Sequence, residues 1–241
     1  MNWEHVLARE FVNATPFGDF AVRLQKALSK RGFTADNTLF ANCTCRDEIN
    51  YRDLDIFAQH WGENFFLAGL GGYPSSGITG FTACLEHVPD DGNLLLVYGP
   101  HIGISESGAL GRVNRAGMHL ETNACGALIS LTEKIRDNDD YQPVLNELDG
   151  EQYLLEKGLQ DYYAEITSDE NSTKKVTEIS FSLIDRKINQ ILDSARPTKQ
   201  IALIGGITVN TTAEAEDYFA LLSEGIVQYE PDGSKYRESV F

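Results

Sequence analysis

The sequence predicts an α/β fold in which a mostly parallel central sheet is flanked by helices. Two observations favour this class. The segments Asn93–Tyr98 (NLLLVY) and Gln200–Asn210 (QIALIGGITVN) are largely apolar runs, which is typical of strands covered on both faces. Segments with helical spacing alternate with such runs, as in parallel sheets with crossover helices. We expect a single domain over residues 1–241, with an N-terminal helical segment at about residues 1–35.

The first half of the chain supplies two predicted helices and one strand. Residues 5–31 have an amphipathic helical pattern, and Gly32 stands where a helix stop is expected. Asn37–Cys45 is short, contains β-branched and aromatic residues, and then meets a charged run, so we expect a buried strand that delivers residues at its carboxyl end. Asp53–Trp61 is predicted to be helical. The glycine-rich stretch Gly69–Gly80 follows.

The second half continues the alternation. A turn is predicted at Pro89–Gly92, directly before the strand Asn93–Tyr98, and this strand is expected to end at Gly99-Pro100-His101. After Gln200–Asn210 we expect an acidic helix near Glu214–Leu222. Three segments between these strands carry helical spacing: Ala127–Ile135, 151–166 and 175–194.

Charge and hydropathy exclude several classes of function. The formal net charge is −16, whereas proteins that bind nucleic acid carry an excess of Lys and Arg. The same charge argues against binding to an anionic membrane surface. No stretch reaches the roughly 18 apolar residues of a membrane span, and no secretory signal or transit segment is visible. We therefore expect a soluble intracellular protein, cytoplasmic or in an organelle stroma.

The four cysteines do not predict a disulfide scaffold, because the chain is large and shows no signal peptide. Cys43 and Cys45 are one residue apart, so both would point to the same face of an extended strand. Metal ligation or simple burial is the better expectation. For Cys43 and Cys84, burial in the core is favoured.

Groups suited to chemistry stand where predicted strands end. Cys45 and Asp47 follow one strand, and His101 follows another. In open α/β sheets, sites form outside the carboxyl ends of the strands. Cys125 opens a predicted helix, where backbone N–H groups lower the pKa of a thiol. Two thiolates and one imidazole would leave a fourth zinc position open, as in catalytic sites. Spacing alone leaves the alternative of buried thiols and a loop histidine open.

Five runs stand out in order along the chain: Cys45–Asn50, Gly69–Pro74, His87–Asn93, Tyr98–Ile104 and Ala124–Ala127. Together they resemble the limiting-CO2-inducible B/C family, and the later Ile201–Asn210 run is also similar. This family is known from algae, diatoms and some bacteria, and it overlaps the theta-type carbonic anhydrases.

The resemblance implies a fold and a metal site similar to those of β-carbonic anhydrases. Those proteins use C-x-D-x-R after one strand and H-x-x-C after another. Cys45 and Asp47 match the first cysteine and the aspartate, His101 matches the histidine, and Cys125 resembles the second cysteine, displaced by an inserted loop. The implied Zn²⁺ ligands are therefore Cys45, His101 and Cys125.

The chain departs from the β-type pattern at one position. Ile49 stands where that pattern has the arginine that would pair with Asp47. Arg52 is the nearest candidate partner. Three other arginines remain open: Arg46, Arg112 and Arg115.

By this resemblance the chain is expected to be a zinc-dependent carbonic anhydrase, a lyase that interconverts CO2 and bicarbonate, and to form a homodimer. Asp47 would orient the nucleophile, and its arginine would hold it ionised. His87 is the main rival of His101 as a ligand, and it is also a candidate proton carrier. The alternative is an inactive family member that serves as a structural or regulatory component of inorganic-carbon handling. Another zinc hydrolase or lyase ranks below both.

Overall fold

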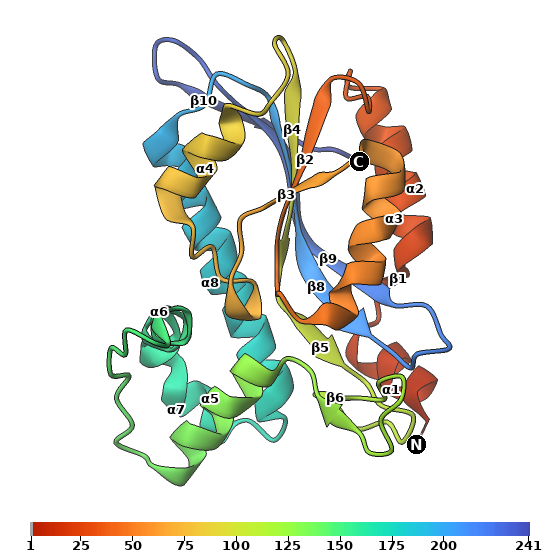
Figure 1. Cartoon of the computed structure of the whole chain (residues 1–241), viewed down its shortest axis with the longest axis vertical. Helices are drawn as coiled ribbons and strands as arrows, with labels where there is room; N and C mark the ends of the chain where they lie inside the picture. The colour runs from red at the N-terminus through yellow and green to blue at the C-terminus, as the bar shows by residue number, and fades with distance from the viewer. Residues whose placement is uncertain (1) are drawn as a thin grey trace.

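The protein is described by a computed structural model that covers residues 2–241. Its core is an eight-stranded sheet in the order β1-β9-β8-β4-β2-β3, in which β10 also pairs with β9 and β5 with β8 (Figure 1). A short antiparallel pair, β6 and β7, lies outside this sheet. The strands are β1 (Thr15–Pro16), β2 (Thr38–Thr44), β3 (Asn64–Phe66), β4 (Asn93–Gly99), β5 (His101–Gly103), β6 (Arg112–Val113), β7 (Thr122–Asn123), β8 (Ile201–Asn210), β9 (Tyr218–Tyr229) and β10 (Lys235–Glu238).

The expected α/β fold with a mostly parallel central sheet is confirmed. The pairs β2–β3, β2–β4, β4–β8 and β5–β8 are parallel. The three pairs that involve β9, which are β1–β9, β8–β9 and β10–β9, are antiparallel. All residues of β4 and β8 are buried, which explains why these strands lack polar alternation. The helices are α1 (Trp3–Glu10), α2 (Phe17–Ser29), α3 (Tyr51–Trp61), α4 (Gly77–Leu85), α5 (Gly126–Asp137), α6 (Gly150–Leu159), α7 (Tyr163–Ser168) and α8 (Ser172–Ala195).

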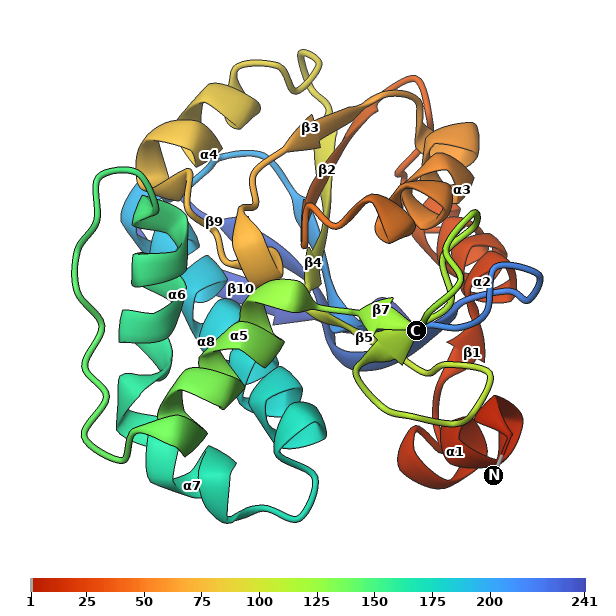
Figure 2. The same ribbon diagram turned by 60° about the horizontal axis from the view of Figure 1, so that its bottom comes forward.

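Helices cover both faces of the sheet. Figure 1 shows α2 and α3 on one face and α4 and α8 on the other. Because side chains alternate along a strand, Leu95 of β4 packs with Phe20 and Phe57 under α2 and α3, whereas Leu96 packs with Ile184 under α8. A third cluster joins α5, α6 and α7 to α8, away from α2 and α3 (Figure 2).

The N-terminal helical pattern is interrupted, so the expectation of one helix over residues 5–31 is wrong. Helices α1 and α2 form separately, and β1 lies between them and pairs with β9. Pro16 accounts for the break, because a proline lacks the backbone N–H and pushes the residue before it, Thr15, towards extended geometry. Pro16 is extended and immediately precedes the first turn of α2.

The expectation of an acidic helix near Glu214–Leu222 is also wrong. The chain forms a turn up to Glu216 and then enters strand β9 at Tyr218. Strand β9 pairs with β8 along nearly its whole length, including Ile207 opposite Ala220. Local helix propensity is overridden here, because β8 would otherwise leave a row of buried backbone groups without partners.

The glycine-rich stretch Gly69–Gly80 permits close backbone packing, and it also contains the start of α4 at Gly77. Gly72 has a φ of +79°, and a Cβ there would lie 2.4 Å from the carbonyl oxygen of Gly99. Only glycine fits that position without moving the backbone. The contact brings the glycine-rich loop against the carboxyl end of β4.

Helix α8 is long, but it carries charged residues along its length. Within residues 2–241, no helix combines the length and apolar character that crossing a bilayer requires.

Candidate metal centre

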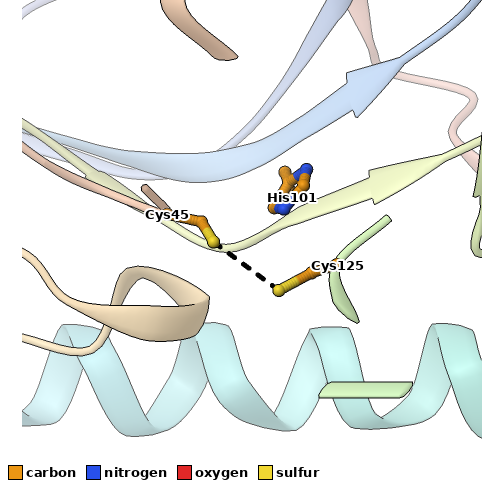
Figure 3. A group of neighbouring side chains, drawn as sticks. All are labelled: Cys45, His101 and Cys125. Carbon is orange, nitrogen blue, oxygen red and sulfur yellow. Dashed lines mark hydrogen bonds between the residues drawn. The ribbon is translucent and has the colours of Figure 1, made fainter. Parts of the chain in front are cut away.

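Three side chains from distant parts of the sequence converge at the carboxyl edge of the sheet. The ligand atoms of Cys45, His101 and Cys125 all lie within 4.8 Å of one another. The two sulfur atoms are 3.6 Å apart, and Figure 3 shows them facing each other with His101 beside them. All three residues are buried, with 1–4% of their surface exposed. The structure therefore brings together the three residues that the sequence singled out as candidate ligands.

The sheet explains this convergence. Strands β2 and β4 are parallel neighbours with Thr44 opposite Gly99, so the residues that follow them emerge at the same edge. Cys45 comes directly after β2, and His101 begins β5, where it pairs with Thr208 of β8. Cys125 immediately precedes α5, and its sulfur lies at the same point.

The donor set fits a zinc ion. Two sulfurs bonded to one tetrahedral zinc at about 2.3 Å would lie roughly 3.8 Å apart, close to the observed 3.6 Å. His101 Nδ1 lies 2.7 Å from Asn210 Oδ1. Its Nε2 atom is buried and has no hydrogen-bond partner among residues 2–241. A buried, unpartnered imidazole nitrogen beside two sulfurs is a set of soft donors that a cation would satisfy.

The ionisation of the two thiols is coupled. A hydrogen bond with Cys125 lowers the pKa of the Cys45 thiol well below its ordinary value, against the opposing effect of burial and with help from His101. The pKa of the Cys125 thiol is raised, first by the same hydrogen bond and then by burial. The shared hydrogen bond therefore favours ionisation of Cys45 over that of Cys125. A metal binds cysteine as thiolate, so its binding would release thiol protons.

The other two cysteines belong to the core. Cys43 points its sulfur towards the carbonyl oxygen of Gly72 at 3.6 Å. Burial raises the pKa of the Cys43 thiol, and it raises the pKa of Cys84 to about 12. Neither belongs to the Cys–His–Cys group, which agrees with the predicted burial of both residues.

Asp47 lies beside the three candidate ligands, and Arg115 holds it there. One carboxylate oxygen of Asp47 is 3.7 Å from His101 Nε2. The Nη2 atom of Arg115 donates to both carboxylate oxygens, at 2.7 and 2.9 Å. Arg115 is itself fixed by Glu48, by Thr122 Oγ1 and by the carbonyl oxygen of Asn123.

Arg52, the nearest candidate from the sequence, is placed elsewhere. Its Nε donates to Asp217 at 2.8 Å, and its Nη2 forms a second ion pair with the same carboxylate. Arg115, one of the arginines left open, takes the position beside Asp47. The correction has a physical reason, because Arg115 is 68 residues away from Asp47 and arrives on the loop between β6 and β7. Sequence spacing cannot report such a contact.

A buried polar network that the sequence analysis missed lies behind His101. Asn210 donates from Nδ2 to Asp217 at 3.1 Å and to Asn50 at 3.3 Å. Asn50 donates in turn to the carbonyl oxygen of Cys45 at 3.2 Å. One signal could have pointed to Asn210, since it ends the strand Gln200–Asn210 at the same sheet edge.

His87 is placed apart from the centre. It is exposed after α4, and its ring lies 5.4 Å from that of Phe65. It is not a member of the Cys–His–Cys group.

A pocket of about 480 Å³ opens beside the centre. Arg115 and Asn210 line it and also contact Asp47 and His101, respectively. Arg52 and Asp217 line it too. The pocket therefore borders both the Asp47–Arg115 pair and the network behind His101.

Asp53 is a further carboxylic acid in this region, besides Asp47, Glu48 and Asp217. It is 3% exposed, and its Oδ2 atom has no hydrogen-bond partner among the described residues. Burial, followed by the negative charge of Asp217, raises the pKa of Asp53 to about 9, although Arg52 opposes the shift. Asp53 is therefore neutral at pH 7 in the folded protein, whereas it ionises near pH 4 in the unfolded chain.

Asp53→Asn is expected to stabilise the protein at alkaline pH. The folded-state pKa of Asp53 is raised, so the folded state keeps a proton that the unfolded state releases, and this residue makes stability fall as pH rises from about 4 to about 9. The neutral amide of the variant does not ionise, so the variant loses this pH dependence of the free energy of unfolding, which has a slope of up to about 1.4 kcal/mol per pH unit. Urea unfolding at pH 6 and pH 8 measures it. Asp55→Asn, an exposed change on the same helix, is the control. An identical pH dependence in Asp53→Asn and wild type would contradict the assignment.

The fold and this edge of the sheet define an α/β protein with a buried Cys–His–Cys group that could hold a metal. Over residues 14–228 the sequence matches the family of limiting CO2-inducible proteins B/C β-carbonic anhydrases, and the chain belongs to that family. The resemblance stated from the sequence is thereby confirmed.

Two solved structures illustrate the likeness. PtLCIB4, a homolog of the limiting CO2-inducible protein LCIB, is 28% identical, and the match covers 97% of this chain and 98% of that one with a TM-score of 0.89. LCIB itself is 24% identical, with 97% of each chain covered and a TM-score of 0.75. No curated protein sequence matches significantly.

Proposed function

We propose that this chain is a zinc-dependent carbonic anhydrase that interconverts CO2 and bicarbonate. The observation that carries the proposal is the position of Asp47. Its carboxylate lies 3.7 Å from the free nitrogen of His101, and both of its oxygens are held by Arg115. A fixed acceptor beside a set of three metal donors is what a hydration site requires.

Cys45, His101 and Cys125 would hold the ion, and three protein ligands leave one tetrahedral position for solvent. Zinc would supply Lewis acidity, which lowers the pKa of water to about 7 and makes hydroxide accessible at neutral pH. The proposal assigns every other task to the protein's own residues.

Asp47 orients the nucleophile. As a carboxylate it only accepts hydrogen bonds, so a water or hydroxide next to it must direct its hydrogen to Asp47 and its lone pair elsewhere. Arg115 fixes Asp47, because its two hydrogen bonds restrain both carboxylate oxygens.

The burial of the centre favours a small, uncharged substrate. The three candidate ligands are almost fully enclosed, and Cys45 and Cys125 border an apolar cluster that includes Leu128 and Leu155. CO2 is small and nonpolar enough to enter such surroundings. The pocket lined by Arg115 and Asn210 would be the route by which bicarbonate and protons reach solvent.

The arginine partner of Asp47 also bears on the non-enzymatic alternative. An inactive family member could keep the fold and the metal while lacking this pair. Here Arg115 occupies that position, which favours the enzyme. The homodimer and the cellular compartment stay predictions.

Stopped-flow measurement of CO2 hydration tests the proposal. Zinc-replete protein is expected to accelerate hydration, to lose that activity when a chelator removes the metal, and to regain it when zinc is restored. If protein carrying one zinc per chain gives no acceleration over buffer, the proposal is wrong and the structural or regulatory alternative takes its place.

A further inference from the structure

Asn210 is nearly fully buried, and all of its side-chain hydrogen-bonding groups have partners. It is 1% exposed at the end of β8, directly behind His101. Its Oδ1 faces His101 Nδ1 at 2.7 Å. Its Nδ2 faces two oxygens, one from Asp217 at 3.1 Å and one from Asn50 at 3.3 Å. The amide therefore links the imidazole to a carboxylate on its other side.

The partners of Nδ2 fix which way the amide points. The carboxylate of Asp217 can only accept hydrogen bonds, so it requires the NH2 group of Asn210. Asn50 adds a second acceptor, because its own NH2 group is committed to the carbonyl oxygen of Cys45. A flipped Asn210 would place its oxygen against two other oxygens in a buried site, which costs free energy.

The orientation of the amide in turn fixes the tautomer of His101. Only Oδ1 of Asn210 faces Nδ1, and this oxygen can only accept, so Nδ1 must carry the hydrogen. In the neutral imidazole the lone pair then resides on Nε2. That atom is the one beside Cys45 and Cys125 that lacks any partner among residues 2–241.

Asp217 is held in place by Thr211 and Arg52 as well as by Asn210. The backbone N–H of Thr211 donates to it at 2.6 Å, and Arg52 pairs with both of its oxygens. Asp217 is 1% exposed, whereas the Arg52 side chain is 40% exposed and lines the pocket beside the centre. The chain of contacts thus runs from the surface through Asp217 and Asn210 to His101.

We propose that Asn210, oriented by the Arg52–Asp217 ion pair, is the positioning residue that holds His101 in the Nδ1–H tautomer and directs its Nε2 lone pair at the metal. The proposal rests on the proposed zinc site, and it gives Arg52 a role through Asp217 rather than through Asp47. Partners of this kind behind a ligating histidine typically change metal affinity by about 10- to 100-fold when they are removed.

Nitrogen NMR of the zinc-free protein at mildly alkaline pH reads the tautomer directly, with His101 assigned by its absence in His101→Gln. Wild type is expected to show a protonated Nδ1 and a bare Nε2. Asn210→Leu removes the acceptor, and Asp217→Asn releases the amide to flip. Both changes should populate the Nε2–H tautomer. If His101 keeps the Nδ1–H form in both variants, the proposal is overturned.

Zinc affinity, measured by competition with a chelator, is the second readout. Asn210→Leu and Asp217→Asn are each expected to weaken zinc binding by about 10- to 100-fold. The matched control is Asn42→Leu, since Asn42 is equally buried on β2 but bonds to Asn64 instead. Equal weakening in the control would show a general loss of structure and contradict a specific role for Asn210.

Arg52 is partly exposed, so its variants test this chain of contacts even if a change at a buried residue prevents folding. Arg52→Gln should shift the tautomer in the same direction, and Arg52→Lys, which keeps the charge, should restore it in part. If folded Arg52→Gln shows no change in the tautomer of His101, the role given to the Arg52–Asp217 ion pair is overturned. If wild type binds no zinc, the proposed function fails, while the tautomer measurement on metal-free protein still decides the present inference.

Discussion

Cys125→Ser is expected to abolish stoichiometric zinc binding and, with it, CO2 hydration. The change replaces a soft, ionisable thiol with a hydroxyl that does not ionise near neutral pH, and it leaves only two of the three protein ligands. We expect zinc affinity to fall by at least about 1,000-fold, since each ligand carries a large share of the roughly 10–16 kcal/mol seen for zinc sites. Metal analysis after dialysis against a chelator measures the loss.

The matched control is Cys43→Ser. Cys43 is buried and only two residues from Cys45, but its sulfur points to Gly72 rather than to the metal donors. This variant should keep its zinc and its activity even if it loses some stability. Full zinc content in Cys125→Ser, or equal loss in both variants, would contradict the assigned ligand set.

Arg115→Gln is expected to lower the rate of CO2 hydration by about 100-fold or more while zinc remains bound. The glutamine cannot supply the positive charge or hold both oxygens of Asp47, so the carboxylate loses its fixed position. Stopped-flow kinetics on protein with verified zinc content measures the effect. Arg136→Gln is the control, because it removes the hydrogen bond from Arg136 of α5 to Ser172 of α8. This variant should keep the wild-type rate.

The double variant sharpens this prediction. Asp47→Asn should cost about as much as Arg115→Gln, and combining the two changes should cost little more than the larger single effect. Residues that act as a unit are strongly non-additive. Fully additive losses would show that Arg115 acts independently of Asp47.

Much of the fold could be predicted because its signals are local. The apolar runs of β4 and β8 identify buried strands, and the rule that sites form at the carboxyl ends of parallel strands places Cys45 and His101 at one edge. Cys125 could be identified from its position before a helix and from the family resemblance. The three residues therefore could be proposed as a group before their proximity was known.

The remaining features depend on long-range contacts. The pairing of Asp47 with Arg115 bridges 68 residues, and the link from Asn210 through Asp217 to Arg52 joins three separate elements. No periodicity reports such contacts. The same is true of β9, whose helix-forming residues become a strand because β8 needs a partner.

X-ray absorption at the zinc edge of the purified protein tests the central claim most directly, because it reports the atoms bonded to the metal. We expect one zinc per chain, with two sulfur atoms at about 2.3 Å and lighter atoms, including one imidazole nitrogen, at about 2.0–2.1 Å. A protein without stoichiometric zinc, or a zinc shell without sulfur, would contradict the assignment of Cys45, His101 and Cys125.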